Sequence, residues 1–171
     1  MIEIERLLAA NRAFAQREAP GARPAPPAMR LAVLTCMDAR VQPVRFLGLG
    51  PGDAHVIRNA GGRATDDALR SLVLSANLLG TRRFLVIHHT DCGLATITDE
   101  QVRAKLTDAY GAAAEGFVAH TYADLEQSVR DDVAVVRHAP LLPGDVEVTG
   151  WVYDVASGRL DEVDPGTDSN E

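Results

Sequence analysis

The chain has 171 residues, 46% of them hydrophobic, and a formal charge of −7 at pH 7, which suits one globular domain with a single core. The acidic balance argues against nucleic-acid binding, because proteins that bind phosphate backbones have basic surfaces. No run approaches the ~18 apolar residues of a membrane span, and the arginines are too dispersed to form a basic tract for anionic membranes.

The first predicted element is an amphipathic helix over residues 2–17. Its apolar face consists of Ile4, Leu7, Leu8 and Phe14, at the spacing of one helical stripe. The proline-rich segment 19–27 follows, and its prolines keep it extended. A helix on such an arm packs either on its own core or on a neighbouring subunit, and the pattern alone favours neither.

Three apolar runs separated by helical segments predict parallel strands joined by right-handed crossovers. The strands are expected at 30–36, 54–59 and 83–88, with helices from Pro43 to about Gly48 or Gly50 and from Thr65 to Gly80. Later segments predict helices at 99–110 and 122–137, and strands at 146–155 and 159–163. We therefore expect a single-domain, three-layer α/β fold with a mostly parallel central sheet over residues 1–163. Residues 1–28 would form a helical arm, and residues 164–171 a disordered tail.

Metal-ligand residue types follow two of these strands. Cys36 ends the first strand, and His89-x-x-Cys92 follows the third. Parallel strands about 4.8 Å apart end at the same edge of a sheet, where ligands of open α/β folds bind. Two thiolates and one imidazole balance a zinc ion and leave a fourth position open, as in catalytic zinc sites.

Other interpretations of these residues remain open. Each cysteine can be a small buried hydrophobic residue, and Cys36 and Cys92 can form a disulfide, although two cysteines are more typical of free thiols in the reducing cytoplasm. His88 competes with His89 as a ligand. We favour His89, because it keeps the His-x-x-Cys spacing and places His88 on the other face of the sheet.

Asp38 and Arg40 lie two residues apart just after Cys36, so in an extended segment their side chains share a face and can pair. In one interpretation they are an ordinary surface ion pair. Beside a zinc ion, Asp38 can instead accept a hydrogen bond from the zinc-bound water or hydroxide while Arg40 keeps it ionised. A third possibility is that Asp38 occupies the fourth zinc position and closes the site.

Three blocks, Cys36-x-Asp38-x-Arg40, Arg58-Asn59-Ala60-Gly61 and His89-x-x-Cys92-Gly93, together resemble the β-class carbonic anhydrases. The similarity is greatest to the short bacterial and archaeal branch. It implies one Zn²⁺ per chain bound by Cys36, His89 and Cys92, with Asp38 and Arg40 as the catalytic dyad. We expect Ala60, Gly61 and Gly93 to bind substrate. The resemblance also implies a homodimer or homotetramer in which the N-terminal arm lies over the partner.

The activity that this resemblance implies is the reversible hydration of carbon dioxide to bicarbonate and a proton by zinc-hydroxide attack. A carbon disulfide or carbonyl sulfide hydrolase on the same zinc site is the nearer alternative. A non-catalytic zinc or thiol sensor is the more distant one. His55 is a candidate proton relay, with Tyr110 and His120 as weaker candidates, although His55 also fits an ordinary surface or core position.

Overall fold

The computed structural model describes residues 4–18 and 21–164, so that residues 165–171 of the predicted tail lie outside it. Most element boundaries fall within two residues of those expected. The helix expected from residue 122 begins at Leu125, because the side chain of Asp124 caps it by accepting the Gln127 amide. The helices are α1 (Ile4–Glu18), α2 (Pro43–Phe46), α3 (Asp66–Leu79), α4 (Asp99–Tyr110) and α5 (Leu125–Arg137). The strands are β1 (Leu31–Cys36), β2 (Ala54–Asn59), β3 (Arg83–His89), β4 (Glu147–Tyr153) and β5 (Leu160–Val163).

The described residues form a five-stranded sheet in the order β2-β1-β3-β4-β5. All neighbouring strands are parallel except β4 and β5, which are antiparallel. The predicted α/β fold with a mostly parallel sheet is therefore confirmed. Because Thr35 pairs with Ile87, the ends of β1 and β3 lie next to each other, and the loops after them leave from the same edge.

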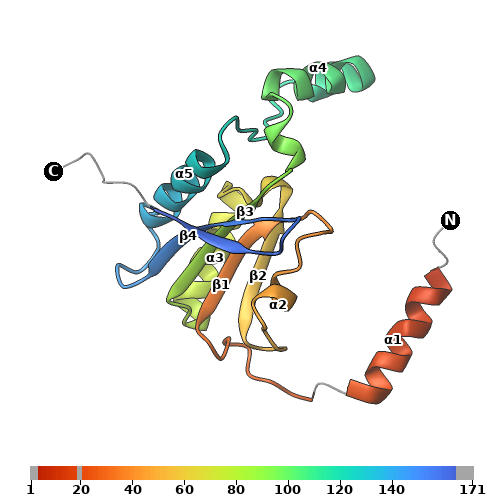
Figure 1. The fold of residues 1–171 in the computed structure, drawn as a ribbon, viewed down its shortest axis with the longest axis vertical. Helices are drawn as coiled ribbons and strands as arrows, with labels where there is room; N and C mark the ends of the chain where they lie inside the picture. The colour runs from red at the N-terminus through yellow and green to blue at the C-terminus, as the bar shows by residue number, and fades with distance from the viewer. Residues whose placement is uncertain (1–3, 19–20, 165–171) are drawn as a thin grey trace.

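Helices cover the two faces of the sheet unequally (Figure 1). On one face, α3 and α5 pack on alternate residues of the central strands, including Leu34, Phe84 and Val86, to form the main core. On the other face, the short α2 and the segment after it pack around Val33 and Ile87 in a smaller core. Successive side chains of a strand alternate between faces, so His88 of β3 points toward α5 and His89 points away from it.

A 3-10 turn, η1 (Ala60–Gly62), carries the chain from β2 across the end of β1. Gly62 has φ +73°, and a Cβ atom there would lie 2.9 Å from the backbone nitrogen of Cys36. Only glycine tolerates both this left-handed conformation and this close approach. The turn is thereby held directly against Cys36, so residues 60–62 form one wall beside the edge where β1 and β3 end.

The N-terminal helix α1 stands apart from the rest of the described structure (Figure 1). Its apolar side chains are exposed: Ile4 by 65%, Leu7 by 51%, Leu8 by 47% and Phe14 by 41%. It therefore buries no apolar face against the other described residues of its own chain. In the described residues, no helix is both long enough and apolar enough to cross a membrane.

Candidate metal centre

Three ligand atoms converge where β1 and β3 end. The sulfurs of Cys36 and Cys92 and a ring nitrogen of His89 all lie within 4.8 Å of one another, and all three residues are buried. In a tetrahedral zinc site, bonds of about 2.3 Å to sulfur and 2.0 Å to nitrogen place the ligand atoms about 3.5–3.8 Å apart. The cluster therefore has the composition and nearly the spacing of a zinc site with three protein ligands.

The ring of His89 is oriented to present Nε2 to this cluster. Its Nδ1 lies 2.8 Å from the carbonyl of Thr90, which fixes the proton on Nδ1 and leaves a lone pair on Nε2. This Nε2 is buried without a hydrogen-bond partner in the described structure. A buried, unpaired nitrogen beside two thiols is what a metal ion would satisfy. His88 faces the opposite side of the sheet, as expected from the alternation along β3.

The two thiols also favour a bound cation. A hydrogen bond with Cys36, opposed by burial and assisted by His89 and Tyr122, lowers the pKa of Cys92 below its usual range. The same contact, together with burial, raises the pKa of Cys36 well above its usual range. The pair therefore holds a buried thiolate charge that a divalent cation would neutralise. The residues present fit zinc by donor type, spacing and charge.

Asp38 is held beside the centre by Arg40. The Arg40 side chain donates from Nε and Nη2 to the two carboxylate oxygens, at 3.0 and 2.7 Å, and its amide donates at 2.8 Å. These contacts keep the pKa of Asp38 well below its usual range. Asp38 Oδ2 lies 4.0 Å from His89 Nε2. In this structure the carboxylate is thus paired with Arg40 at the edge of the ligand cluster.

Arg40 also contacts Asp91, a residue that sequence reasoning missed. Its Nη1 donates to the Asp91 carboxylate at 2.6 Å and its Nη2 to the Asp91 carbonyl at 2.9 Å. Arg58 supports the same loop by donating to the carbonyls of Cys36 and Asp38 at 3.0 and 2.7 Å. The two arginines therefore fasten the loop after β1 and join it to the loop after β3.

A shallow cavity of about 210 Å³ opens onto the cluster. The three residues predicted to bind substrate, Ala60, Gly61 and Gly93, all line it, together with Met37 and Leu94. The wall is tight at Gly61, where an added Cβ would lie 2.7 Å from the Leu94 side chain. The lining is mainly apolar apart from Asp38 and the two cysteines, and it suits a small, uncharged molecule.

None of the candidate proton relays extends this site. His55 lies near the opposite end of β2 from Asn59, which pairs with Cys36. Its Nδ1 is 2.7 Å from Ser75 Oγ, so it is a half-buried residue bound to α3. Tyr110 ends α4 and is 70% exposed, and the His120 amide donates to Asp99.

Sequence reasoning also missed a set of polar residues behind the centre: Arg63, Tyr122, Ser128 and Asp132. The available signal was His88, because a histidine predicted to be buried inside a strand requires buried partners. Asp132 gave a second signal, since it shares the apolar face of α5 with Val129, Val133 and Val136.

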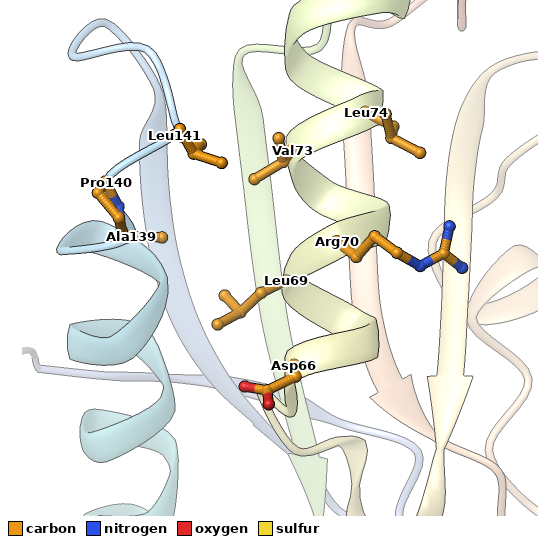
Figure 2. Close-up of a pocket in the computed structure, with 8 residues that line it drawn as sticks. All are labelled: Asp66, Leu69, Arg70, Val73, Leu74, Ala139, Pro140 and Leu141. Carbon is orange, nitrogen blue, oxygen red and sulfur yellow. The ribbon is translucent and has the colours of Figure 1, made fainter.

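A second apolar groove lies away from the metal centre, between α3 and residues 139–141 (Figure 2). Leu69 and Val73 of α3 point into it from one side, and Leu141 faces them from the other. Leu141 is 69% exposed. The lining of the groove is apolar except for Asp66 and Arg70.

Comparison with known proteins identifies a family. The sequence profile described as "Carbonic anhydrase" matches residues 31–160. The chain is 41% identical to "Beta-carbonic anhydrase 1" of Mycobacterium tuberculosis, over 85% of this chain and 88% of that protein. It is also 41% identical to "Carbon disulfide hydrolase" of an Acidianus species, over 77% and 76% of the two chains. The crystal structure of a carbonic anhydrase from Streptococcus mutans aligns over 96% of this chain and 99% of its own, with a TM-score of 0.87 and 41% identity.

Proposed function

The chain belongs to the β-class carbonic anhydrase family, and we propose that its Cys36–His89–Cys92 centre converts carbon dioxide and water to bicarbonate and a proton. The observation that carries the proposal is the position of Asp38. Its carboxylate is fixed by Arg40 and lies 4.0 Å from the His89 nitrogen that faces the two thiols. A hydrogen-bond acceptor is thus held beside a three-ligand zinc site.

When bound, zinc supplies a water whose pKa is lowered enough for a hydroxide nucleophile to exist near neutral pH. Asp38 Oδ2, 4.0 Å from His89 Nε2, would accept a hydrogen bond from this water or hydroxide and orient its lone pair toward the substrate. Arg40 donates to Oδ1 from its Nε and backbone amide and to Oδ2 from its Nη2, which keeps the carboxylate ionised and fixed in orientation. Oδ2 keeps a second lone pair, because a carboxylate oxygen can accept two hydrogen bonds. Asp91 holds Arg40 from the other side.

The cavity supports the choice of carbon dioxide. A small apolar molecule gains from leaving water for the wall formed by Met37, Leu94 and Ala60. Bicarbonate is charged and gains nothing from that wall, so the lining favours release of the product. The proton leaves toward the open side of the cavity, where Asp38 is 22% exposed.

Stopped-flow carbon dioxide hydration by the zinc-loaded protein, from pH 7 to 9, tests the proposal. We expect turnover that rises with pH, because two thiolates donate more charge to the metal than imidazoles do and keep the pKa of its water higher. The matched control is Cys36→Ala, which should lose both zinc and turnover. Zinc-loaded protein without hydration activity at any pH in this range would contradict the proposal.

A second candidate is hydrolysis of carbon disulfide or carbonyl sulfide. The 41% identity to the Acidianus carbon disulfide hydrolase favours it, and both substrates are as small and apolar as carbon dioxide. Measuring kcat/KM for all three substrates on one preparation distinguishes the two functions. The sensor alternative requires Asp38 on the metal, whereas Arg40 holds this carboxylate through three hydrogen bonds of 3.0 Å or less.

Self-association is part of the proposal. The exposed apolar face of α1 (Ile4, Leu7, Leu8 and Phe14) needs a partner surface, and the groove between α3 and residues 139–141 offers one. We assign the groove to α1 of a second copy, with residues 1–28 as the exchanged arm and residues 31–163 as the body. The 12-residue connection from Glu18 to Leu31 can extend to about 40 Å, enough to reach a neighbouring subunit.

Sedimentation analysis tests this assignment. Leu7→Glu, which puts a charge into the apolar face, should convert dimers to monomers, whereas Arg12→Glu on the polar face should not. Leu141→Glu in the groove should have the same effect as Leu7→Glu. A dimer that survives both leucine substitutions would exclude this contact.

We also place the protein in the cytoplasm. Both of its cysteines are free and belong to the ligand cluster, and a reducing compartment keeps such thiols available for metal. Cell fractionation with an antibody to the chain tests the assignment.

A further inference from the structure

A buried group of polar side chains lies on the face of β3 opposite the metal cavity. It consists of His88, Arg63, Asp132 and Tyr122, which come from β3, the segment after η1, α5 and the segment before α5. His88 is fully buried, and the side chains of Asp132 and Arg63 are 6% and 13% exposed. None of these residues takes part in the mechanism described above, so their burial requires another explanation.

Asp132 contacts both Arg63 and His88. Arg63 Nε lies 2.8 Å from Asp132 Oδ2, and its Nη2 donates to Asp132 Oδ1 at 3.3 Å. On the other side, His88 Nε2 lies 3.1 Å from Asp132 Oδ2, while His88 Nδ1 is 2.8 Å from Ser128 Oγ. Asp132 is therefore the centre of a linkage that joins η1, β3 and α5.

The ring of Tyr122 rests against this linkage. The Arg63 guanidinium lies 5.5 Å from the ring centroid, within the range of a cation–π contact. The His88 ring stacks on it with centroids 5.7 Å apart and 24° between the planes. The Tyr122 amide donates to the Leu94 carbonyl at 3.3 Å. Both the ring and the backbone of Tyr122 are thus fixed relative to the loop that carries Cys92.

The phenol oxygen of Tyr122 is buried and has no hydrogen-bond partner in the described structure. It lies close enough to Cys92 for each group to shift the pKa of the other. A phenol carries its proton at neutral pH, so this hydroxyl is available as a hydrogen-bond donor. A buried hydroxyl without another partner is expected to donate a hydrogen bond to a neighbouring thiolate.

We propose that Tyr122 is a positioning residue for the metal centre: its hydroxyl donates a hydrogen bond to the Cys92 thiolate, and the Arg63–Asp132–His88 linkage holds its ring in place. The inference rests on the zinc centre of the proposed function. It adds a residue outside the ligand set that controls how much charge one sulfur gives to the metal. A donor on the sulfur withdraws part of that charge, so the metal keeps more of its own.

Cobalt-substituted protein gives the direct test. The hydrogen bond stabilises the sulfur lone pairs, so its loss should lower the energy of the thiolate-to-cobalt charge-transfer band. We expect Tyr122→Phe, which removes one oxygen and keeps the ring, to move this band to longer wavelength. Tyr110→Phe, at the exposed end of α4, should leave the band unchanged. In chelator competition, Tyr122→Phe should weaken zinc binding about 10-fold, the lower end of the effect of losing such a partner.

A band and a zinc affinity that match the wild type in Tyr122→Phe would overturn the inference. Should that variant fail to fold, Asp132→Asn keeps the phenol but loosens its support, and we expect a smaller shift of the band in the same direction. An unshifted band in folded Asp132→Asn would likewise count against the linkage. Failure of the wild type itself to bind cobalt or zinc would instead refute the metal centre and the proposed function with it.

Discussion

Two arginine–aspartate pairs lie beside the two successive histidines of β3, and their surroundings differ. Arg40 and Asp38 stand at the open cavity, next to His89, with side chains 48% and 22% exposed. Arg63 and Asp132 lie behind the sheet, next to His88, with side chains 13% and 6% exposed. Water screens the first pair but not the second. The open pair can therefore serve catalysis at little cost to folding, whereas loss of either member of the closed pair leaves a buried charge.

The largest expected effect comes from breaking the closed pair. Asp132→Ala leaves the Arg63 guanidinium buried without its carboxylate, and removal of one partner from a buried pair typically costs about 3–5 kcal/mol. Urea unfolding of the zinc-loaded protein measures this loss. The control is Asp131→Ala on the same helix, where an exposed carboxylate accepts from the Gln127 side chain at 2.8 Å. If Asp132→Ala lowered the free energy of unfolding by less than about 1 kcal/mol, the closed pair would contribute no more to stability than an exposed ion pair.

Substitution in the open pair should lower activity and leave stability nearly unchanged. Asp38→Asn keeps the shape of the side chain but replaces one acceptor oxygen with a donor, so the nucleophile loses its acceptor. We expect kcat/KM for carbon dioxide to fall about 100-fold, the lower end for loss of one preorganised hydrogen bond to the reacting group. Zinc content should be unchanged, and stability should change by less than about 1 kcal/mol. Stopped-flow assays, metal analysis and urea unfolding report the three quantities. Full activity in Asp38→Asn would remove the role given to the dyad.

A third substitution separates pairing with Arg40 from proximity to the metal. Asp91 binds the same guanidinium as Asp38, but its side chain is 72% exposed and it is absent from the cavity lining. We expect Asp91→Asn to lower kcat/KM by less than about threefold, in keeping with the small energy of an exposed ion pair. A loss as large as that of Asp38→Asn would show that the position of Arg40, and not the acceptor on Asp38, limits the reaction.

The open side of the molecule was predictable from sequence because its residues lie close to strand ends. Apolar runs place Cys36 and His89 at neighbouring carboxyl ends, and the alternation along β3 assigns His88 and His89 to opposite faces. The helix of the N-terminal arm was predictable, but the sequence does not identify the surface on which its apolar face packs. Boundaries moved where a side chain, such as that of Asp124, determined the start of a helix.

The closed side was not predictable, because its contacts join residues far apart in sequence. Arg63 and Asp132 are 69 positions apart, and neither lies in a periodic motif that points to the other. Tyr122 belongs to an irregular segment between α4 and α5, where local propensity gives no direction to a side chain. His88 and Asp132 showed that buried polar partners must exist, but only the packing of α5 on β3 identifies them.

A further aspartate, Asp99, holds the segment that carries Tyr122 in place through hydrogen bonds. Asp99, at the start of α4, accepts from the Ala119 amide, and from the Thr121 amide at 3.0 Å and hydroxyl at 2.7 Å. The Thr121 side chain and these amides lower the pKa of Asp99. Its carboxylate therefore adds stability that is fully present above the unfolded pKa of about 3.9 and is lost as the pH falls through the lower folded pKa.

The smallest expected effect follows from this sign. Asp99→Asn cannot ionise, so at pH 7 it should melt a few degrees below the wild type, and the gap should narrow below about pH 4 as the wild-type carboxylate is protonated. Melting curves of both proteins from pH 3 to 7 measure the gap, and any acid loss of zinc common to both cancels in the difference. Asp108→Asn, an exposed carboxylate of the same helix, should show no such narrowing. If the difference in melting temperature between Asp99→Asn and the wild type stayed constant with pH, the ionised Asp99 carboxylate would not contribute to folding stability. If this difference narrowed at low pH and the cobalt band of Asp99→Asn also shifted toward that of Tyr122→Phe, the hydrogen bonds of Asp99 would help to position Tyr122 beside the sulfur of Cys92.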